Sequence, residues 1–196
     1  MSDSPRLILA SGSPRRRDLL DEAGYSFEVI KPDIEEIEDG SLPIREVTAD
    51  NAALKAEAVS RTHPDAVIIA ADTLVLLGER NLSKPLDKAE ATSMLNSLNG
   101  KSHQVFTAVT LMRTAPEKRH RFTIATDVHF KTLSEDEMAA YHDRINPMDK
   151  AGAYAAQEHG ELIIERIEGS MTNVIGLPMD EVKAALESEF GITPRP

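Results

Sequence analysis

The first part of the chain reads as a strand, a tight polar turn and a helix, and this order most constrains the fold. A short apolar run is followed by the turn-forming sequence Ala10-Ser11-Gly12-Ser13. Ser13 can cap a helix, and Pro14 suits the first helical position because the N–H that proline lacks would have no partner there. We therefore predict a strand over 6–10 joined directly to a helix over 14–23, as in α/β proteins.

Three consecutive arginines occupy the first turn of this predicted helix, Arg15 to Arg17. That end of a helix is already positive, so the arginines destabilise it unless an anion binds there, and helix N-termini are ready sites for phosphate. Successive helical side chains are about 100° apart, so the three cannot converge on one ligand. The spacing pairs Arg17 with Asp21. Arg15 and Arg16 are the candidate anion ligands, and a solvated helix start is the alternative.

Helical and strand patterns alternate along the rest of the chain. The continuous apolar run at 66–71 predicts a buried strand that ends at Asp72. Pro116 separates two long strand patterns and indicates an antiparallel hairpin. Mixing such a hairpin with βα units predicts a mixed sheet. The other expected strands are 27–30, 103–113, 121–130 and 162–167, and the other expected helices are 44–61, 88–99, 134–144 and 180–190.

Composition limits the class of protein and of ligand. The 196 residues, 41% of them hydrophobic, allow a sizeable core in one domain or in two closely joined lobes. The absence of cysteine excludes disulfides and thiolate metal sites and agrees with a reducing compartment. There is no apolar stretch of signal-peptide or membrane-span length. We therefore expect a cytoplasmic protein that does not enter the membrane.

The net charge of −11 argues against a nucleic-acid binder, since such proteins need a broad basic surface. An anionic ligand must then be small, such as a nucleotide, and be captured by a local cluster of cations together with a divalent metal ion.

Several polar residues are candidates for chemistry, each with an ordinary alternative. Asp72 stands where a buried strand emerges, the place at which α/β sheets bind ligands, although a turn-forming aspartate is the commoner role there. The acidic loop 33–39 can hold a hard cation, although most such loops are merely solvated. Lys55 and Lys84 read locally as surface lysines. His103, at a probable strand start, reads as structural.

Five short motifs stand in order along nearly the whole chain and together resemble the Maf family of nucleotide pyrophosphatases. Each motif would be weak alone, but the ordered set is specific. They read LILASGSPRR at 7–16, ADT at 71–73, KP at 84–85, GAYAAQ at 152–157 and GSMTNVIGLP at 169–178.

The resemblance implies a fold, a reaction and a cofactor. The fold would be an elongated mixed β-sheet with flanking helices, like that of inosine triphosphatases, with residues 1–196 as a single domain of two lobes around a central cleft. The reaction would convert a nucleoside triphosphate to the monophosphate and pyrophosphate with Mg²⁺ or Mn²⁺. The partner would be a small nucleotide rather than nucleic acid or a membrane, and a homodimer is an option.

The resemblance also assigns roles to residues. The family's proton acceptor falls on Asp72, which together with Glu36 would hold the metal ion. Phosphate-binding positions match Ser11, Arg15, Arg16, Lys55 and Lys84, and substrate-selecting positions match Arg15, Thr73 and Gln157.

The arginine, threonine and glutamine at the selecting positions resemble the branch that acts on dTTP and UTP. Gln157 has a donor and an acceptor in one amide, which suits the imide edge shared by thymine and uracil. Glu158 departs from the family pattern, in which glycine is frequent there, and can alter nucleotide preference. The alternatives are a pyrophosphatase for modified nucleotides such as 7-methyl-GTP and a nucleotide-binding regulator of cell division or septum formation.

Overall fold

The computed structural model describes residues 5–37 and 42–195, which fall into two compact units. Unit 1 comprises Met1–Asp72, Thr107–Ile124 and Gly176–Pro196, and unit 2 comprises Thr73–Phe106 and Ala125–Ile175. Three of the boundaries between them fall inside long strands.

Seven strands form one sheet in the order β2-β1-β3-β5-β6-β7, with β4 paired to β3. Strand β1 is parallel to β2 and β3, whereas the β3–β4 and β6–β7 pairs are antiparallel, so the predicted mixed sheet is confirmed. The strands are β1 (Leu7–Leu9), β2 (Glu28–Val29), β3 (Val67–Leu77), β4 (Arg80–Leu82), β5 (Ser102–Arg113), β6 (Lys118–Phe130) and β7 (Ile164–Glu168).

The predicted hairpin is formed by the neighbouring strands β5 and β6. Only residues 114–117 separate them, and a parallel pair would need a crossover of about a dozen residues or more. The link is therefore antiparallel, and β6 begins at Lys118, three residues earlier than the sequence pattern suggested.

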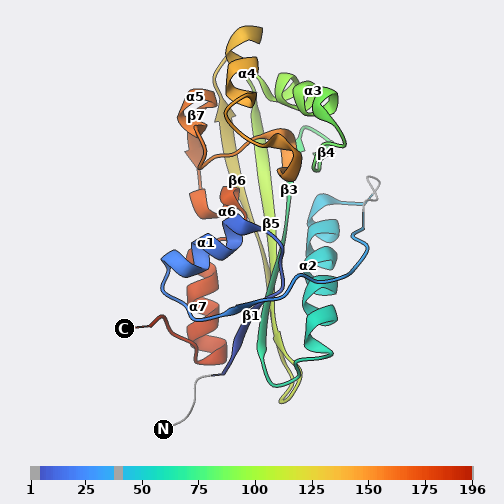
Figure 1. Ribbon diagram of the computed structural model, residues 1–196, viewed down its shortest axis with the longest axis vertical. Coiled ribbons are helices and arrows are strands. Elements are labelled where there is room, and N and C mark those ends of the chain that lie inside the picture. The colour runs from blue at the N-terminus through green and yellow to red at the C-terminus, as the bar shows by residue number, and fades with distance from the viewer. Residues whose placement is uncertain (1–4, 38–41, 196) are drawn as a thin grey trace. The chain divides into compact units, whose positions relative to one another are not determined.

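In unit 1, helices cover both faces of the central strands. Side chains alternate along a strand, so Leu7 and Leu9 pack in one cluster with α1 (Pro14–Glu22) and α7 (Met179–Phe190). Ile8 packs in a second cluster with α2 (Ile44–Ser60). Figure 1 shows α2 on one side of β1 and β3 and α7 on the other. Burial on both faces explains why the strand sequences are continuously apolar.

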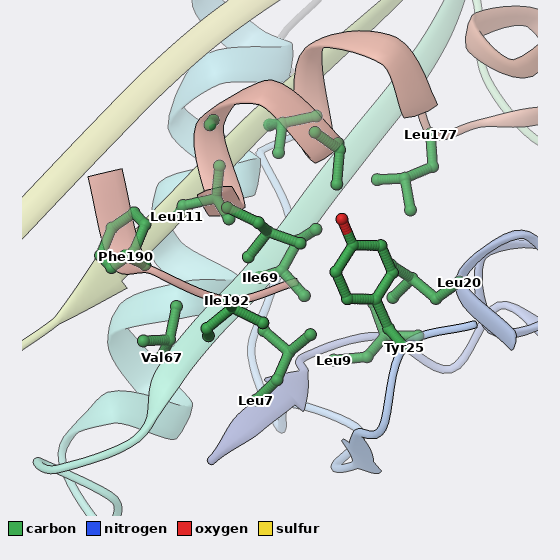
Figure 2. Close-up of a cluster of buried hydrophobic side chains, with 14 of the residues drawn as sticks. Leu7, Leu9, Leu20, Tyr25, Val67, Ile69, Leu111, Leu177, Phe190 and Ile192 are labelled. Carbon is green, nitrogen blue, oxygen red and sulfur yellow. The ribbon is translucent and has the colours of Figure 1, made fainter. Parts of the chain in front are cut away.

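The larger cluster of unit 1 contains two rings among aliphatic side chains (Figure 2). Tyr25 and Phe190 are almost fully buried there, beside Leu20, Ile69 and Leu177. The cluster joins the first helix to the last one and so fixes the turn that leads into α1.

In unit 2 two helices begin at side chains that cap them. The carboxylate of Asp87 accepts a hydrogen bond from the backbone N–H of Glu90, which starts α3 (Lys88–Leu98), although Glu90 itself accepts from Leu86 rather than closing a reciprocal box. Ser134 and Glu137 form the full capping box of α4 (Glu135–His142). The remaining helices are short: α5 (Gly160–Ile163), α6 (Met171–Ile175) and the 3-10 turns Pro147–Asp149 and Ala151–Ala153.

The buried strand does not end at Asp72, which corrects the sequence prediction: β3 continues to Leu77. Its last part is paired with β4, where Val75 lies opposite Leu82. A carboxylate is tolerated in the middle of this strand because it is ion-paired with a buried lysine. None of the described helices is long and apolar enough to cross a membrane.

Candidate active site

A buried lysine links two carboxylates in unit 1. The Nζ atom of Lys55 on α2 lies 2.6 Å from Oδ1 of Asp72 on β3 and 3.1 Å from Oε2 of Glu36. The side chains of Lys55 and Asp72 are each 8% exposed, whereas that of Glu36 is 39% exposed. The second oxygen of Asp72, Oδ2, is buried and has no hydrogen-bond partner among the described residues. We call Lys55, Asp72 and Glu36 the lysine cluster.

Asn51 fixes the segment that carries Glu36. It lies one helical turn before Lys55 on the buried face of α2. Its Oδ1 accepts from the backbone N–H of Ile37 at 2.7 Å, and its Nδ2 donates to the carbonyl of the same residue at 3.1 Å. The sequence alone does not indicate this role of Asn51, because its partner Ile37 lies 14 residues away in the chain.

Arg16 is buried at the start of α1 and held by unit 1. Its Nε donates to the carbonyl of Gly176 at 2.8 Å, and its Nη1 donates to the hydroxyl of Ser11 at 3.2 Å. Burial lowers the pKa of Arg16, and the negative charges of Asp72 and Glu36 oppose that shift. Ser11 also accepts from the backbone N–H of Ser13, which shapes the turn. The predicted anion ligand Arg16 thus belongs to the same electrostatic environment as the lysine cluster.

The predicted pair between Arg17 and Asp21 is wrong. The guanidinium of Arg17 instead turns to the adjacent Asp18, at 2.8 Å, and both side chains are more than half exposed. Asp21 lies 3.7 Å from Arg195, which also donates to the backbone carbonyl of Gly24. The C-terminal segment therefore takes the acidic partner that the helix spacing had assigned to Arg17.

Two polar side chains in unit 2, Tyr141 and His142, clamp the loop that leads to Gln157. The hydroxyl of Tyr141 donates to the carbonyl of Ala155 and accepts from its N–H, both at 3.0 Å. The ring of His142 lies 3.1 Å from the carbonyl of Ala153. Ala153 has a φ of 59°, a left-handed conformation that non-glycine residues adopt mainly where the surroundings enforce it. These contacts were not predicted from the sequence, since they join residues of no common periodicity.

His103 belongs to the same clamp and is structural, as predicted. Its Nε2 lies 2.8 Å from the hydroxyl of Tyr154, and its ring packs edge-on against Phe130. Burial, with a smaller contribution from His129, lowers the pKa of His103 to about 4. The imidazole is therefore neutral near pH 7.

Three of the remaining candidate residues lie in unit 2, and Arg15 lies in unit 1. Gln157 is exposed, and its Nε2 donates to Oε1 of Glu158 at 3.2 Å. Lys84 is exposed as well, and the preceding Ser83 accepts from Gly152 in the Gln157 loop at 3.1 Å. Thr73 is half-buried on β3, directly after Asp72. Arg15 is half-buried on α1 and belongs to unit 1, as do Ser11, Arg16 and the lysine cluster.

The sequence model of the family described as Maf-like protein matches residues 6–189. The chain belongs to the Maf family. It is 47% identical to a dTTP/UTP pyrophosphatase of Akkermansia muciniphila, over 93% of this chain and 95% of that protein. It is 41% identical to a dTTP/UTP pyrophosphatase of Bacillus pumilus, over 96% of this chain and 98% of that protein.

The Maf chain also shares its fold with the Ham1 protein of Staphylococcus aureus, with a TM-score of 0.55 over 94% of this chain and 99% of that one. Sequence identity is only 16%, so this likeness shows the fold alone. It bears out the expected mixed sheet with flanking helices.

The acidic residues of the Maf site fit a magnesium-type ion bound together with substrate. Within the described part of the chain no group of three or more acidic or histidine side chains forms a complete metal cage. Mg²⁺ commonly binds through one or two carboxylates plus substrate phosphates, and Asp72 and Glu36 supply two carboxylates with one orphaned oxygen, Oδ2. Glu38 and Asp39, the end of the predicted acidic loop, lie outside the described residues.

Proposed function

We propose that this Maf protein hydrolyses dTTP and UTP to the nucleoside monophosphate and pyrophosphate. The observation that carries the proposal is the buried carboxylate of Asp72, which Lys55 holds through Oδ1 while Oδ2 has no partner among the described residues. A module that only binds nucleotides needs cations and has little use for such a group. The relatives named above, at 47% and 41% identity, are dTTP/UTP pyrophosphatases.

Asp72 is the proton acceptor in this proposal. Its Oδ2 accepts the proton of a water molecule as the water oxygen forms a bond to the α-phosphorus, and the bond from that phosphorus to the pyrophosphate oxygen breaks. Lys55 fixes the direction of the carboxylate because it donates to the other oxygen at 2.6 Å. Holding a catalytic group in the reacting geometry lowers the barrier of the reaction.

Cations of the site hold the triphosphate. Arg16 offers a planar guanidinium already oriented by Ser11 and by a backbone carbonyl, and Lys55 offers a point charge. Arg15 and Lys84 supply further positive charge. Glu36 would hold Mg²⁺ or Mn²⁺, which when bound neutralises charge on the leaving pyrophosphate.

Selection of the base falls to Arg15, Thr73 and Gln157 in this proposal. The amide of Gln157 can donate and accept at once, and both thymine and uracil present an N–H beside a carbonyl. We place the activity in the cytoplasm, on free nucleotides rather than nucleic acid, since a net charge of −11 repels long polyanions.

The test is pyrophosphate release from dTTP, UTP, CTP, GTP and 7-methyl-GTP with Mg²⁺ or Mn²⁺. We expect dTTP and UTP to be the best substrates, and Asp72→Asn to lower kcat by about 10²- to 10⁴-fold because it removes the proton acceptor. Asp50→Asn, on the exposed side of α2, makes the same chemical change away from the site and leaves the rate unchanged. Equal rates for wild type and Asp72→Asn would remove Asp72 from the mechanism, and a preference for a purine nucleotide would refute the substrate assignment.

A further inference from the structure

One oxygen of Glu158 is shared between Gln157 and a buried lysine. The Nε2 atom of Gln157 lies 3.2 Å from Oε1 of Glu158, and the same oxygen lies 3.5 Å from Nζ of Lys150. A carboxylate oxygen accepts hydrogen bonds and donates none. The nitrogen end of the Gln157 amide therefore faces Glu158.

Lys150 is an anchor rather than a mobile surface lysine. It is 5% exposed, and its ammonium donates to the carbonyl of Asn146 at 2.8 Å and to Oδ1 of Asp149 at 2.9 Å. Three acceptors thus hold one ammonium. The Glu158 oxygen therefore lies within ion-pair distance of a positive charge that is itself held in the interior of unit 2.

The backbone on both sides of the pair is also constrained. Tyr141 clamps Ala155, two residues before Gln157. His159, directly after Glu158, has a φ of 57°, in the left-handed region. Because this stretch of backbone is already ordered, binding a base through Gln157 carries little cost of ordering the loop.

The orientation of the amide matters because pyrimidines present opposite patterns. Uracil and thymine offer a donor at N3 beside a carbonyl acceptor at C4, whereas cytosine offers an acceptor at N3 beside an amine donor at C4. A glutamine amide that rotates freely can match either pattern by exchanging its oxygen and nitrogen ends. An amide held in one orientation matches only one of them.

We infer that Glu158 is a positioning residue that selects uracil and thymine over cytosine, because it fixes which end of the Gln157 amide faces the base. One hydrogen of Nε2 is given to Glu158, the other remains for the carbonyl at C4, and Oε1 accepts from N3–H. Flipping the amide to match cytosine would point Oε1 at a carboxylate oxygen. The inference rests on the proposed function and assigns Glu158 to its base-reading step.

The experiment compares kcat/KM for UTP and CTP in wild type, Glu158→Gln and the control Glu165→Gln. A glutamine at 158 can accept or donate, so both orientations of Gln157 become available. We expect the UTP-to-CTP ratio of kcat/KM to fall about fivefold in Glu158→Gln, the effect of one hydrogen bond. Glu165 is exposed on β7. The control Glu165→Gln removes the same charge away from Gln157, and we expect it to keep the wild-type ratio.

If Glu158 had a purely structural role, Glu158→Gln would lower kcat/KM for UTP and CTP equally. An unchanged ratio would therefore overturn the inference. A Gln157→Ala background gives a second readout, since Glu158→Gln should then have no further effect on the ratio. A change of the ratio in that background would show that Glu158 acts without Gln157. If wild type hydrolyses neither UTP nor dTTP, the proposed function fails and takes the inference with it, whereas UTP hydrolysis with an unaltered ratio removes the inference alone.

Discussion

Lys55 is ion-paired with both carboxylates of the lysine cluster, so we expect its loss to affect the stability of unit 1 and the proposed reaction together. The variant Lys55→Met would leave the 8% exposed Asp72 without its charged partner, which we expect to destabilise the fold by about 3 kcal/mol. Activity should fall by about 100-fold, since the carboxylate loses its orientation and the phosphates lose a cation. Urea denaturation and pyrophosphate release measure the two effects.

The double variant Lys55→Met with Asp72→Asn separates stability from chemistry. It removes both charges of the buried pair, so it should recover most of the lost stability while remaining inactive. A double variant no more stable than Lys55→Met alone would contradict the importance of the ion pair.

Asn51 acts at the residue scale through the loop that it holds. Asn51→Leu removes both hydrogen bonds to Ile37 and frees the segment that carries Glu36. We expect the Mn²⁺ concentration for half-maximal activity to rise by about tenfold, as for other residues that orient metal ligands. The kcat at saturating Mn²⁺ should change little, and an unaltered Mn²⁺ requirement would argue against Glu36 as a ligand.

At the scale of elements, His103 on β5 makes the stability of the fold sensitive to acid. Because the pKa of His103 is lowered to about 4 in the fold, the unfolded chain binds more protons as the pH falls from about 6.5. The contribution of neutral His103 to the free energy of unfolding is therefore fully present above pH 6.5. It is lost as the pH falls toward 4, by about 3 kcal/mol at most. Replacing His103 with glutamine should flatten the pH dependence of the unfolding free energy in that window. A wild-type stability independent of pH there would contradict the assignment.

Elements with a strong local signal could be predicted from the sequence, and those set by distant contacts could not. The first βα unit, the hairpin and the Ser134 capping box depend on neighbouring residues and periodicity. Strand β3 continues past Asp72 only because Lys55 neutralises the carboxylate and β4 pairs with the later residues. Neither condition is visible in the local pattern.

For the whole molecule, the ordered motifs identified the family and listed most of the candidate residues, whereas their partners came from the structure. Ser11, Arg16, Glu36, Lys55 and Asp72 belong to unit 1, and Thr73, Lys84 and Gln157 belong to unit 2. Residues that hold these in place, such as Asn51 and Tyr141, carry no motif. Their roles depend on packing across elements, which one sequence does not reveal.

The position of bond cleavage tests the central claim most directly. Hydrolysis of UTP in H₂¹⁸O, followed by mass spectrometry of both products, shows which phosphorus the water attacks. We expect one ¹⁸O atom in UMP and none in pyrophosphate, because Asp72 directs water to the α-phosphorus. Label in the pyrophosphate, or release of orthophosphate and UDP, would contradict the claim.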